Sequence, residues 1–198
     1  MKNSRTTYDS FIDISSLLVS KREEKIAREK AELLSNTDYL TGLTNRRAFE
    51  EQLELEINGA KREGKTLGII LIDIDHFKII NDTYGHQVGD MVLKNFASFL
   101  SRHSRSNDFM GRYGGEEFIL CLPGVNTEEA LKIAERLRQS VQEHMIPVPG
   151  LKPLNITASF GVAVLKVSEG ENLESLIKRA DKALYRAKEE GRNCSRLS

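Results

Sequence analysis

The sequence predicts an α+β fold in which a sheet that contains antiparallel strands is covered by helices. Three observations predict it. Apolar residues at helical spacing alternate along the chain with short apolar runs, a Gly-Gly pair separates two strand-like segments, and 39% of the 198 residues are hydrophobic. Alternating periodicities are typical of layered sheets and helices, and a hairpin among them introduces antiparallel pairing. We expect one domain, residues 38–198, after a short N-terminal segment, residues 1–37.

The N-terminal segment is predicted to be a coiled-coil helix. One apolar series recurs at strict seven-residue spacing, and it consists of Ile12, Val19, Ile26 and Leu33. A competing seam is offered by Phe11, Ile14 and Leu18. A heptad repeat with mostly polar partner positions predicts a weak parallel coiled coil of ambiguous register.

The first part of the domain reads as helix, strand and helix. A helix that ends near Gly64 is marked by apolar residues four apart, namely Phe49, Leu53 and Ile57. An apolar run from about Gly68 to Asp73 follows and predicts a strand. The next helix is indicated by Leu93, Phe96, Ala97 and Leu100. These spacings fit one buried face of a helix.

The second part begins with a hairpin around Gly114 and Gly115, whose second arm carries alternating Phe118, Leu120 and Leu122. A helix then starts at Asn126 or Thr127, with acids in its first turn. After a loop at 147–150, alternating apolar residues over 156–164 predict a strand inside the sheet. The final helix is marked by Leu173, Leu176, Ile177, Ala180, Ala183 and Leu184.

Two groups of acids lie where strands end. Asp73 and Asp75 are two apart, so on a strand they share a face. Glu116 and Glu117 follow Gly114 and Gly115 directly, and glycine permits tight turns and the close approach of a ligand. Neighbouring carboxylates favour a bound cation, and Mg²⁺ takes carboxylates, carbonyls and phosphates. A strand that ends in solvated acids is the alternative for Asp-x-Asp alone.

Five ordered blocks of this sequence resemble the GGDEF-domain diguanylate cyclases, in the variant with Glu at the third signature position. The blocks are Asp38–Arg47, Asp73–Lys78, Asn81–Asp90, Gly114–Phe118 and Ala183–Asn193. The resemblance covers about residues 38 to 193. It implies a fold like the ferredoxin-like palm of nucleotidyl cyclases and polymerases, and the condensation of two GTP molecules into cyclic di-GMP with release of two pyrophosphates.

The resemblance also implies roles for single residues. A divalent ion, Mg²⁺ or Mn²⁺, would be held by Asp73, the Ile74 carbonyl and Glu116. Glu116, or alternatively Glu117, would accept the ribose hydroxyl proton. Positive charge and an open approach for the phosphates would come from Lys78, Lys188, Arg192, Gly114 and Gly115, with Lys188 and Arg192 expected one turn apart on one helix face.

Guanine recognition is expected from residues of the third block. The carboxylate of Asp90 can accept from N1–H and N2–H₂ of guanine together, and the Asn81 amide can pair with another edge. His86 is expected to border the nucleotide, with packing within the loop as its alternative. Phe77 completes the predicted substrate-binding set.

Arg105 and Asp108 match the R-x-x-D inhibitory motif of many such cyclases, and Arg136 occupies the place of the auxiliary arginine. A product-binding site is expected there, because arginine reads phosphate and guanine edges with a bidentate fork. The alternative is a surface ion pair of little energetic weight.

Composition excludes several classes of protein. Lys plus Arg and Asp plus Glu both number 29, so nucleic-acid binding is not expected. No apolar stretch is long enough for a membrane span. Two cysteines give no disulfide or zinc framework, and we expect a cytoplasmic protein.

Two alternatives to an active cyclase remain open: a catalytically silent receptor for cyclic di-GMP, and a cyclase that makes adenine-containing dinucleotides. A homodimer through the N-terminal segment is expected, since such helices resemble linkers between sensor and cyclase domains. No sensor is recognisable, and the sequence leaves open whether one belongs to a longer protein.

Overall fold

The structure is a computed structural model that describes residues 21–23, 25, 26 and 35–198. The chain divides into two units at residue 37, and each is described by itself. Most of the predicted heptad positions, Phe11, Ile12, Ile14, Leu18, Val19 and Leu33, lie outside the described residues. The coiled coil therefore stays a prediction. No helix within the described ranges is both long enough and apolar enough to cross a membrane.

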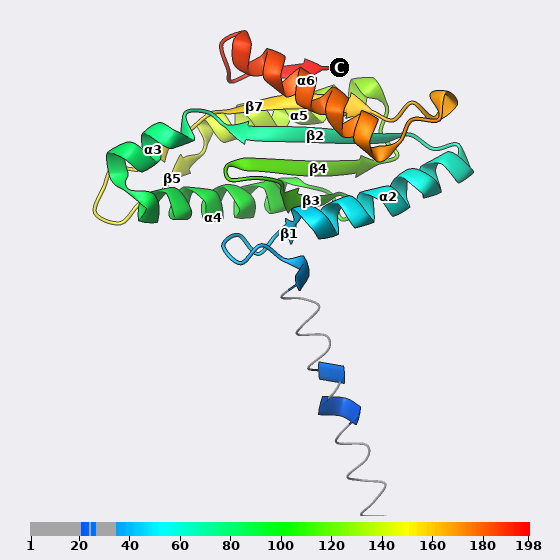
Figure 1. Cartoon of the computed structure of the whole chain (residues 1–198). Helices are drawn as coiled ribbons and strands as arrows, with labels where there is room; N and C mark the ends of the chain where they lie inside the picture. The colour runs from blue at the N-terminus through cyan, green and yellow to red at the C-terminus, as the bar shows by residue number, and fades with distance from the viewer. Residues whose placement is uncertain (1–20, 24, 27–34) are drawn as a thin grey trace, which may run out of the picture. The chain divides into compact units, whose positions relative to one another are not determined.

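The second unit, residues 38–198, alternates strands and helices (Figure 1). Its elements are β1 (Thr44–Asn45), α2 (Arg46–Glu63), β2 (Leu67–Ile74), α3 (Phe77–Tyr84), α4 (His86–His103), β3 (Phe109–Arg112), β4 (Glu117–Pro123), α5 (Thr127–Glu143), β5 (Met145–Ile146), β6 (Leu154–Asn155), β7 (Ala158–Val164), the short 3₁₀ helix η1 (Val167–Glu169), α6 (Leu173–Glu189) and β8 (Ser195–Leu197).

The main sheet has six strands in the order β1-β3-β4-β2-β7-β8. Strand β2 pairs antiparallel with both β4 and β7, and β3 pairs antiparallel with β4. The two edge strands, β1 and β8, pair parallel. The predicted α+β fold with an antiparallel-containing sheet is confirmed.

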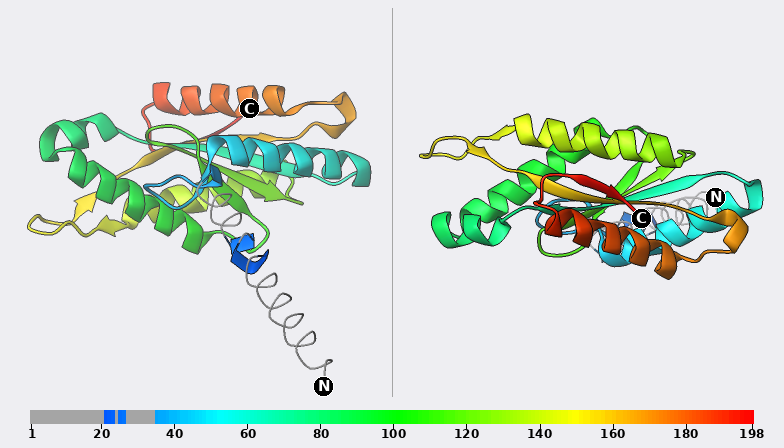
Figure 2. Two further views of the ribbon diagram at one scale, coloured as in Figure 1. Left: turned by 60° about the horizontal axis from the view of Figure 1, so that its bottom comes forward. Right: turned by 90° about the horizontal axis from the view of Figure 1, so that it is seen from above.

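Helices cover both faces of this sheet. Figure 2 shows α4 and α5 on one side of the strands and α2 and α6 on the other. Along β2, Ile70, Ile72 and Ile74 pack with α4 and α5, whereas Ile69 and Leu71 pack with α2 and α6. All eight residues of β2 are buried, as expected of a strand covered on both faces. Odd-numbered residues of β2 therefore face α6.

Helix ends follow the predicted signals. Asn126 and Glu129 form a capping box at the start of α5, which satisfies two backbone donors that have no partner within the helix. At the start of α6 the Asn172 side chain, which was not predicted as a cap, accepts from Ser175 N. Helix α2 ends at Gly64, which has φ 66°, a left-handed conformation that glycine adopts without strain.

Several of the short elements were not predicted. Helix α3 has eight residues, of which only Phe77 is buried, so it carries little periodic signal. The strand predicted over 156–164 begins only at Ala158, and β5 and β6 form a separate two-stranded sheet. Strand β8 is short and polar, and it is recognised only by its pairing with β7.

Gly161 sets how closely α6 approaches the sheet. A Cβ at this position of β7 would overlap the Ala180 carbonyl and the Leu184 amide of α6. We expect Gly161→Ala to lower the free energy of unfolding by about 3 kcal/mol, the upper part of the range for overpacking, because backbone atoms cannot move aside. Urea denaturation measures the effect.

Gly59→Ala is the matched control. Gly59 lies within α2, and a Cβ built there has no described atom within 4 Å apart from its chain neighbours and the adjacent backbone of its own helix. Alanine should raise stability by about 0.5–1 kcal/mol through helix propensity. Equal effects of the two substitutions would contradict the close packing of α6 on β7.

Candidate functional site

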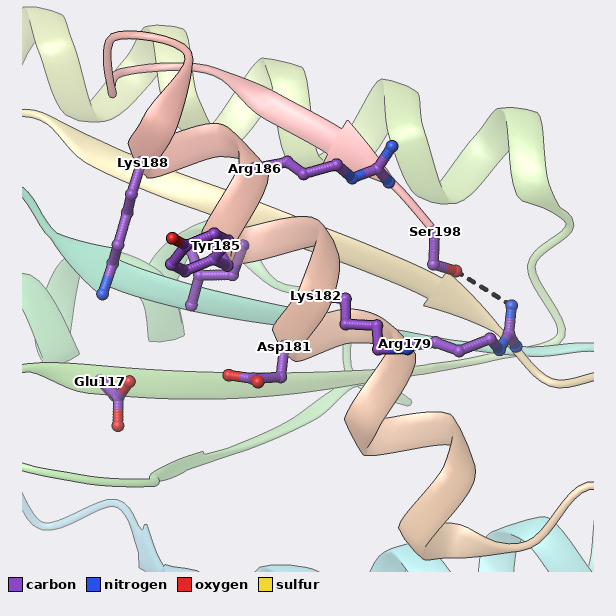
Figure 3. A pocket seen from close by; sticks show the side chains of 9 residues that line it. Glu117, Arg179, Asp181, Lys182, Tyr185, Arg186, Lys188 and Ser198 are labelled. Carbon is purple, nitrogen blue, oxygen red and sulfur yellow. Dashed lines mark hydrogen bonds between the residues drawn. The ribbon is translucent and has the colours of Figure 1, made fainter.

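Two carboxylates meet at the end of the β2–β4 pair. The register places Asp73 opposite Glu117, and opposite residues of an antiparallel pair project to the same face. That face is the one covered by α6. Asp73 is only 7% exposed, and Glu117 lines two pockets, of about 620 and 550 Å³, that flank it. Figure 3 shows Glu117 and Lys188 at one end of the larger pocket.

Burial raises the pKa of Asp73, a shift that the ammonium of Lys188 opposes and the charge of Asp75 reinforces. Burial also raises the pKa of Glu117, where the charge of Asp73 acts in the same direction and Lys188 against it. A cation close to both acids would favour their ionised forms. Lys188 Nζ supplies some of this positive charge, donating to Asp73 Oδ2 at 2.7 Å.

Glu116 is brought to the site mainly through its backbone. Its carbonyl accepts from Ile74 N at 3.3 Å, which places the loop before β4 beside the end of β2. A backbone hydrogen bond thus brings Glu116 next to Ile74 and Asp73, the other two members of the predicted metal-binding set. The side chain paired across the strands with Asp73, however, is that of Glu117. Strand register decides this point, and the sequence alone did not reveal it.

The signature glycines serve close approach rather than an unusual turn. Neither Gly114 nor Gly115 has a positive φ, so neither uses a backbone conformation that is closed to other residues. A Cβ on Gly114 would lie 2.5 Å from Glu117 Oε2, whereas a Cβ on Gly115 would have no described atom within 4 Å apart from its chain neighbours. Gly114 leaves room for the carboxylate, and Gly115 borders open space.

Arg112 fixes the loop that carries these glycines. Its Nε and Nη2 donate to the Gly115 carbonyl at 3.2 and 2.7 Å. Its Nη1 donates to both oxygens of Asp38, at 3.1 and 3.2 Å. Asp38 is held in turn by the amide and hydroxyl of Thr41. A turn at the start of the domain therefore braces the signature loop.

Helices α3 and α4 carry the residues predicted to contact guanine. The Asn81 side chain and the Phe77 ring lie where a Cβ on Gly89 would be, so glycine is required for these two helices to pack together. Asn81 therefore lies beside the residue that precedes Asp90. Asp90 and His86 are exposed on α4, and Lys78 is exposed on α3. Phe77 is 7% exposed and packs into the core.

Lys188 and Arg192 do not share a helix face, and that expectation is wrong. Helix α6 ends at Glu189, and Arg192 lies beyond Gly191 in a turn with φ 65°. Arg192 nevertheless lies near the acids, since its charge acts to lower the pKa of Asp73 against the larger effect of burial. The structure brings both basic residues to Asp73 by different routes.

The family "Diguanylate cyclase, GGDEF domain" matches residues 35–194. The chain belongs to the GGDEF family. It is 46% identical over 161 residues to the response regulator PleD of Caulobacter vibrioides, covering 81% of this chain and 35% of PleD. It is 42% identical over 159 residues to the diguanylate cyclase DgcZ of Escherichia coli, covering 80% of this chain and 52% of DgcZ. The chain thus spans between about a third and a half of these two relatives.

Solved structures of GGDEF proteins show the same fold. The coiled coil and GGDEF domain of DgcB from Caulobacter crescentus, in complex with c-di-GMP, matches with a TM-score of 0.86 and 34% identity, covering 97% of this chain and 100% of that one. The active GGEEF domain of a diguanylate cyclase from Vibrio cholerae matches with a TM-score of 0.71 and 37% identity, covering 78% and 97%. The expected palm-like fold and family are confirmed.

The GGDEF domain also brings together the residues of the R-x-x-D motif. Asp108 Oδ2 accepts from Arg105 N at 2.9 Å, and Asp108 N donates to the Arg105 carbonyl at 3.1 Å, so the motif is a tight turn between α4 and β3. Arg136 Nη2 on α5 donates to the His103 carbonyl at 3.3 Å. Arg136 therefore contacts the last residue of α4, His103, which precedes Arg105 by two positions.

A second polar cluster of the GGDEF domain was missed in the sequence. Tyr113 Oη donates to Glu50 Oε1 at 2.8 Å, and Arg46 Nε donates to the same oxygen at 2.9 Å. The Arg46 guanidinium also lies 4.4 Å from the centre of the Tyr113 ring. Burial and the Glu50 carboxylate raise the pKa of Tyr113. The cluster joins α2 to the residue before Gly114, a contact that no local spacing signals.

The Asp38–Arg112 pair yields a pH-dependent prediction. Burial would raise the pKa of Asp38, but hydrogen bonds from Thr41 and Arg112 outweigh it and leave the pKa below the ordinary 3.8. A lowered carboxyl pKa stabilises the fold above the unfolded value and loses that effect as pH falls through the folded value. Asp38→Asn should therefore cost about 1.5–3 kcal/mol at pH 7, and the difference should shrink below pH 3.8.

Urea denaturation of wild type and variant at both pH values measures this difference. Glu51→Gln is the control, because Glu51 pairs with Arg47 on an exposed helix face, where side chains are 63% and 55% exposed. It should change stability by less than about 0.5 kcal/mol. A pH-independent cost of Asp38→Asn would show that its charge does not stabilise the turn.

Proposed function

We propose that this chain is a diguanylate cyclase, which condenses two GTP molecules into cyclic di-GMP and releases two pyrophosphates. The observation that carries the proposal is the signature hairpin, which sets Glu117 opposite Asp73 beside Lys188. Diguanylate cyclases among its relatives support the same activity. Each of the two condensation steps is an attack of a ribose 3′-hydroxyl on an α-phosphate, in which negative charge spreads over phosphoryl oxygens.

GGDEF diguanylate cyclases generally use divalent metal ions, and the donor set of this chain fits one. Within the described ranges no three His, Cys, Asp or Glu side chains are grouped so as to hold a metal by themselves, so the proposed site needs a backbone carbonyl and the substrate phosphates as further ligands. One or two carboxylates, backbone carbonyls and substrate phosphates are the ligands that Mg²⁺ commonly uses. We propose Mg²⁺ or Mn²⁺ held by Asp73, the Ile74 carbonyl and Glu116, with Glu117 as the competing carboxylate. The ion would neutralise charge that develops on the phosphates.

Proton transfer is assigned to the signature acids. Glu116 is the proposed acceptor of the ribose hydroxyl proton, with Glu117 as the alternative. The raised pKa of Glu117, caused by burial and by Asp73, favours this alternative, because a general base works best when its pKa approaches the working pH. Separate substitution of the two acids distinguishes them.

The remaining residues are proposed to bind and orient GTP. Lys78, Lys188 and Arg192 supply positive charge to the phosphates, and Gly114 and Gly115 let them approach the loop. Guanine is assigned to the α3–α4 junction, at Asn81, His86 and Asp90, with Phe77 packing beneath. Guanine presents the N1–H and N2–H₂ donors together to the Asp90 carboxylate, and adenine presents no such pair, which is the proposed basis for choosing guanine over adenine.

Two such domains are proposed to act together. The product has twofold symmetry, so two GTP-loaded sites must face each other across a twofold axis. Residues 1–37 are the proposed dimerising coiled coil, and residues 38–198 the catalytic domain. A coiled coil raises the local concentration of the second domain, and the solved DgcB structure likewise comprises a coiled coil and a GGDEF domain. An upstream sensor and a cytoplasmic location are parts of the same proposal.

Product chromatography tests the function directly. The purified chain is incubated with Mg²⁺ and GTP, alone and mixed with ATP, and we expect cyclic di-GMP in both. Binding of added cyclic di-GMP without synthesis would show a silent receptor. Products that contain adenine would show a cyclase of different specificity.

Substitution of the acids tests the site. Asp73→Asn should lower turnover by at least about a hundredfold, because a site that works mostly by electrostatics loses one ligand charge. Glu116→Gln and Glu117→Gln, measured side by side at increasing Mg²⁺, show which acid supports metal affinity and which supports turnover. Glu128→Gln on the exposed face of α5 is the control. Near-normal turnover of both signature variants would refute the assignment.

We further propose that the product inhibits the enzyme at Arg105, Asp108 and Arg136. The placement of all three at the end of α4 supports one shared surface. Product held there, across two domains, would keep the active sites apart, provided that it binds this arrangement better than the productive one. The complex of DgcB with c-di-GMP is consistent with product binding in the family.

Arg105→Ala should weaken product inhibition about ten- to a hundredfold, since a charged bidentate contact contributes on the order of 1.5–3 kcal/mol. This substitution is easier to interpret than Asp108→Ala, because the Asp108 side chain also holds the turn by accepting from Arg105 N. Titration of cyclic di-GMP into wild type, Arg105→Ala and the control Arg102→Ala measures the effect. Equal inhibition of all three would remove Arg105 from the site.

A further inference from the structure

Asp75 is a buried carboxylate that the proposed chemistry does not use. It is 5% exposed. Ser159 Oγ donates to its Oδ1 at 2.6 Å, and Thr157 Oγ1 donates to its Oδ2 at 2.7 Å. A third donor, the backbone N–H of Asn193, reaches Oδ2 at 3.0 Å. Two of these donors belong to β7 and the segment before it, and the third belongs to the turn after α6.

Backbone strain is concentrated around this carboxylate. Within the described part of the chain, non-glycine residues with positive φ are His76 at 58°, Arg192 at 65° and Asn193 at 45°. His76 follows Asp75 in the chain, and Arg192 and Asn193 form the turn that donates to it. Left-handed residues other than glycine are unfavourable and persist only where their surroundings hold them. All three positions lie next to Asp75, either in the chain or in the turn that donates to its carboxylate.

The turn is held on its far side as well. Arg138 Nη1 on α5 donates to Asn193 Oδ1 at 2.9 Å, and Asn193 Nδ2 donates to Gln142 Oε1 at 3.1 Å. Arg192 N donates to the Ala187 carbonyl at 3.0 Å. The backbone of the turn is therefore fixed from three directions, while the Arg192 side chain stays exposed on the side of Asp73.

We propose that Asp75 is a positioning residue, which acts through the Asn193 N–H to hold the turn that presents Arg192 to the phosphates of GTP. The inference rests on the proposed function. A carboxylate suits this task because its two oxygens only accept hydrogen bonds. An amide carries no charge and accepts at one oxygen only, so its hydrogen bond to the Asn193 N–H is weaker or lost.

A double-mutant cycle tests the coupling. GTP KM and kcat are measured for wild type, Asp75→Asn, Arg192→Ala and the double variant, along with the Kd of a non-hydrolysable GTP analogue. Asp75→Asn should raise KM and Kd roughly tenfold with kcat little changed, because ground-state binding is lost. In the Arg192→Ala background the same substitution should add less than about twofold, since residues that act through one another are not additive.

Two further variants keep the test decisive. Asn193→Ala leaves the hydrogen bonds of Asp75 to the sheet but loses both side-chain anchors of the turn, and it should show the same coupling to Arg192→Ala even if Asp75→Asn folds poorly. Ser159→Ala removes one hydrogen bond from Asp75 without touching the turn, and it should change Kd less than about twofold. If the losses of GTP-analogue affinity multiply in both double variants, that with Asp75→Asn and that with Asn193→Ala, then neither residue acts through Arg192 and the inference is overturned. A wild type that neither binds the analogue nor makes product would instead overturn the proposed function.

Discussion

Seven register pairs join β2 to β4, from Leu67 opposite Pro123 to Asp73 opposite Glu117, and the placement of the candidate site follows from that pairing. A slip of one residue would turn every side chain of a strand to the other face. Because both faces of β2 are buried against helices, such a slip would misplace the core and the acids together. The packing of the core therefore also fixes the geometry of the carboxylates.

Charge balance at the end of this strand pair is a second constraint. Three acids, Asp73, Asp75 and Glu117, lie on the face that α6 covers. Asp75 is satisfied by hydrogen bonds, whereas Asp73 and Glu117 keep raised pKa values through burial. The site thus separates one structural carboxylate from two that retain an affinity for positive charge. Lys188 satisfies part of that affinity from α6.

Most of the fold could be predicted from the sequence, because helix signals are local. The caps at Asn126, Asn172 and Gly64 and the spacing of apolar residues in α2 and α5 are visible in short windows. What could not be predicted depends on distant contacts. Strand β8 exists through its pairing with β7, and the choice between Glu116 and Glu117 opposite Asp73 depends on register.

The candidate site shows the same division. The acids, glycines and basic residues were identified by their motifs, but their partners were not. Arg192 was misplaced on the helix because Gly191 and two left-handed residues after it end α6 earlier than the spacing suggests. The bracing of Gly115 by Arg112 and Asp38 joins residues 74 positions apart, and no pattern within one segment can indicate such a contact.

The contact between Lys188 and Asp73 spans 115 positions of the chain, and this separation has a consequence during synthesis. Chains grow from the N-terminus at about 5–20 residues per second, so the signature hairpin leaves the ribosome several seconds before α6. Until that last helix docks on β7, the buried end of β2 lacks the cation that balances it. A nascent chain therefore carries the complete signature sequence while the site it belongs to is still unformed.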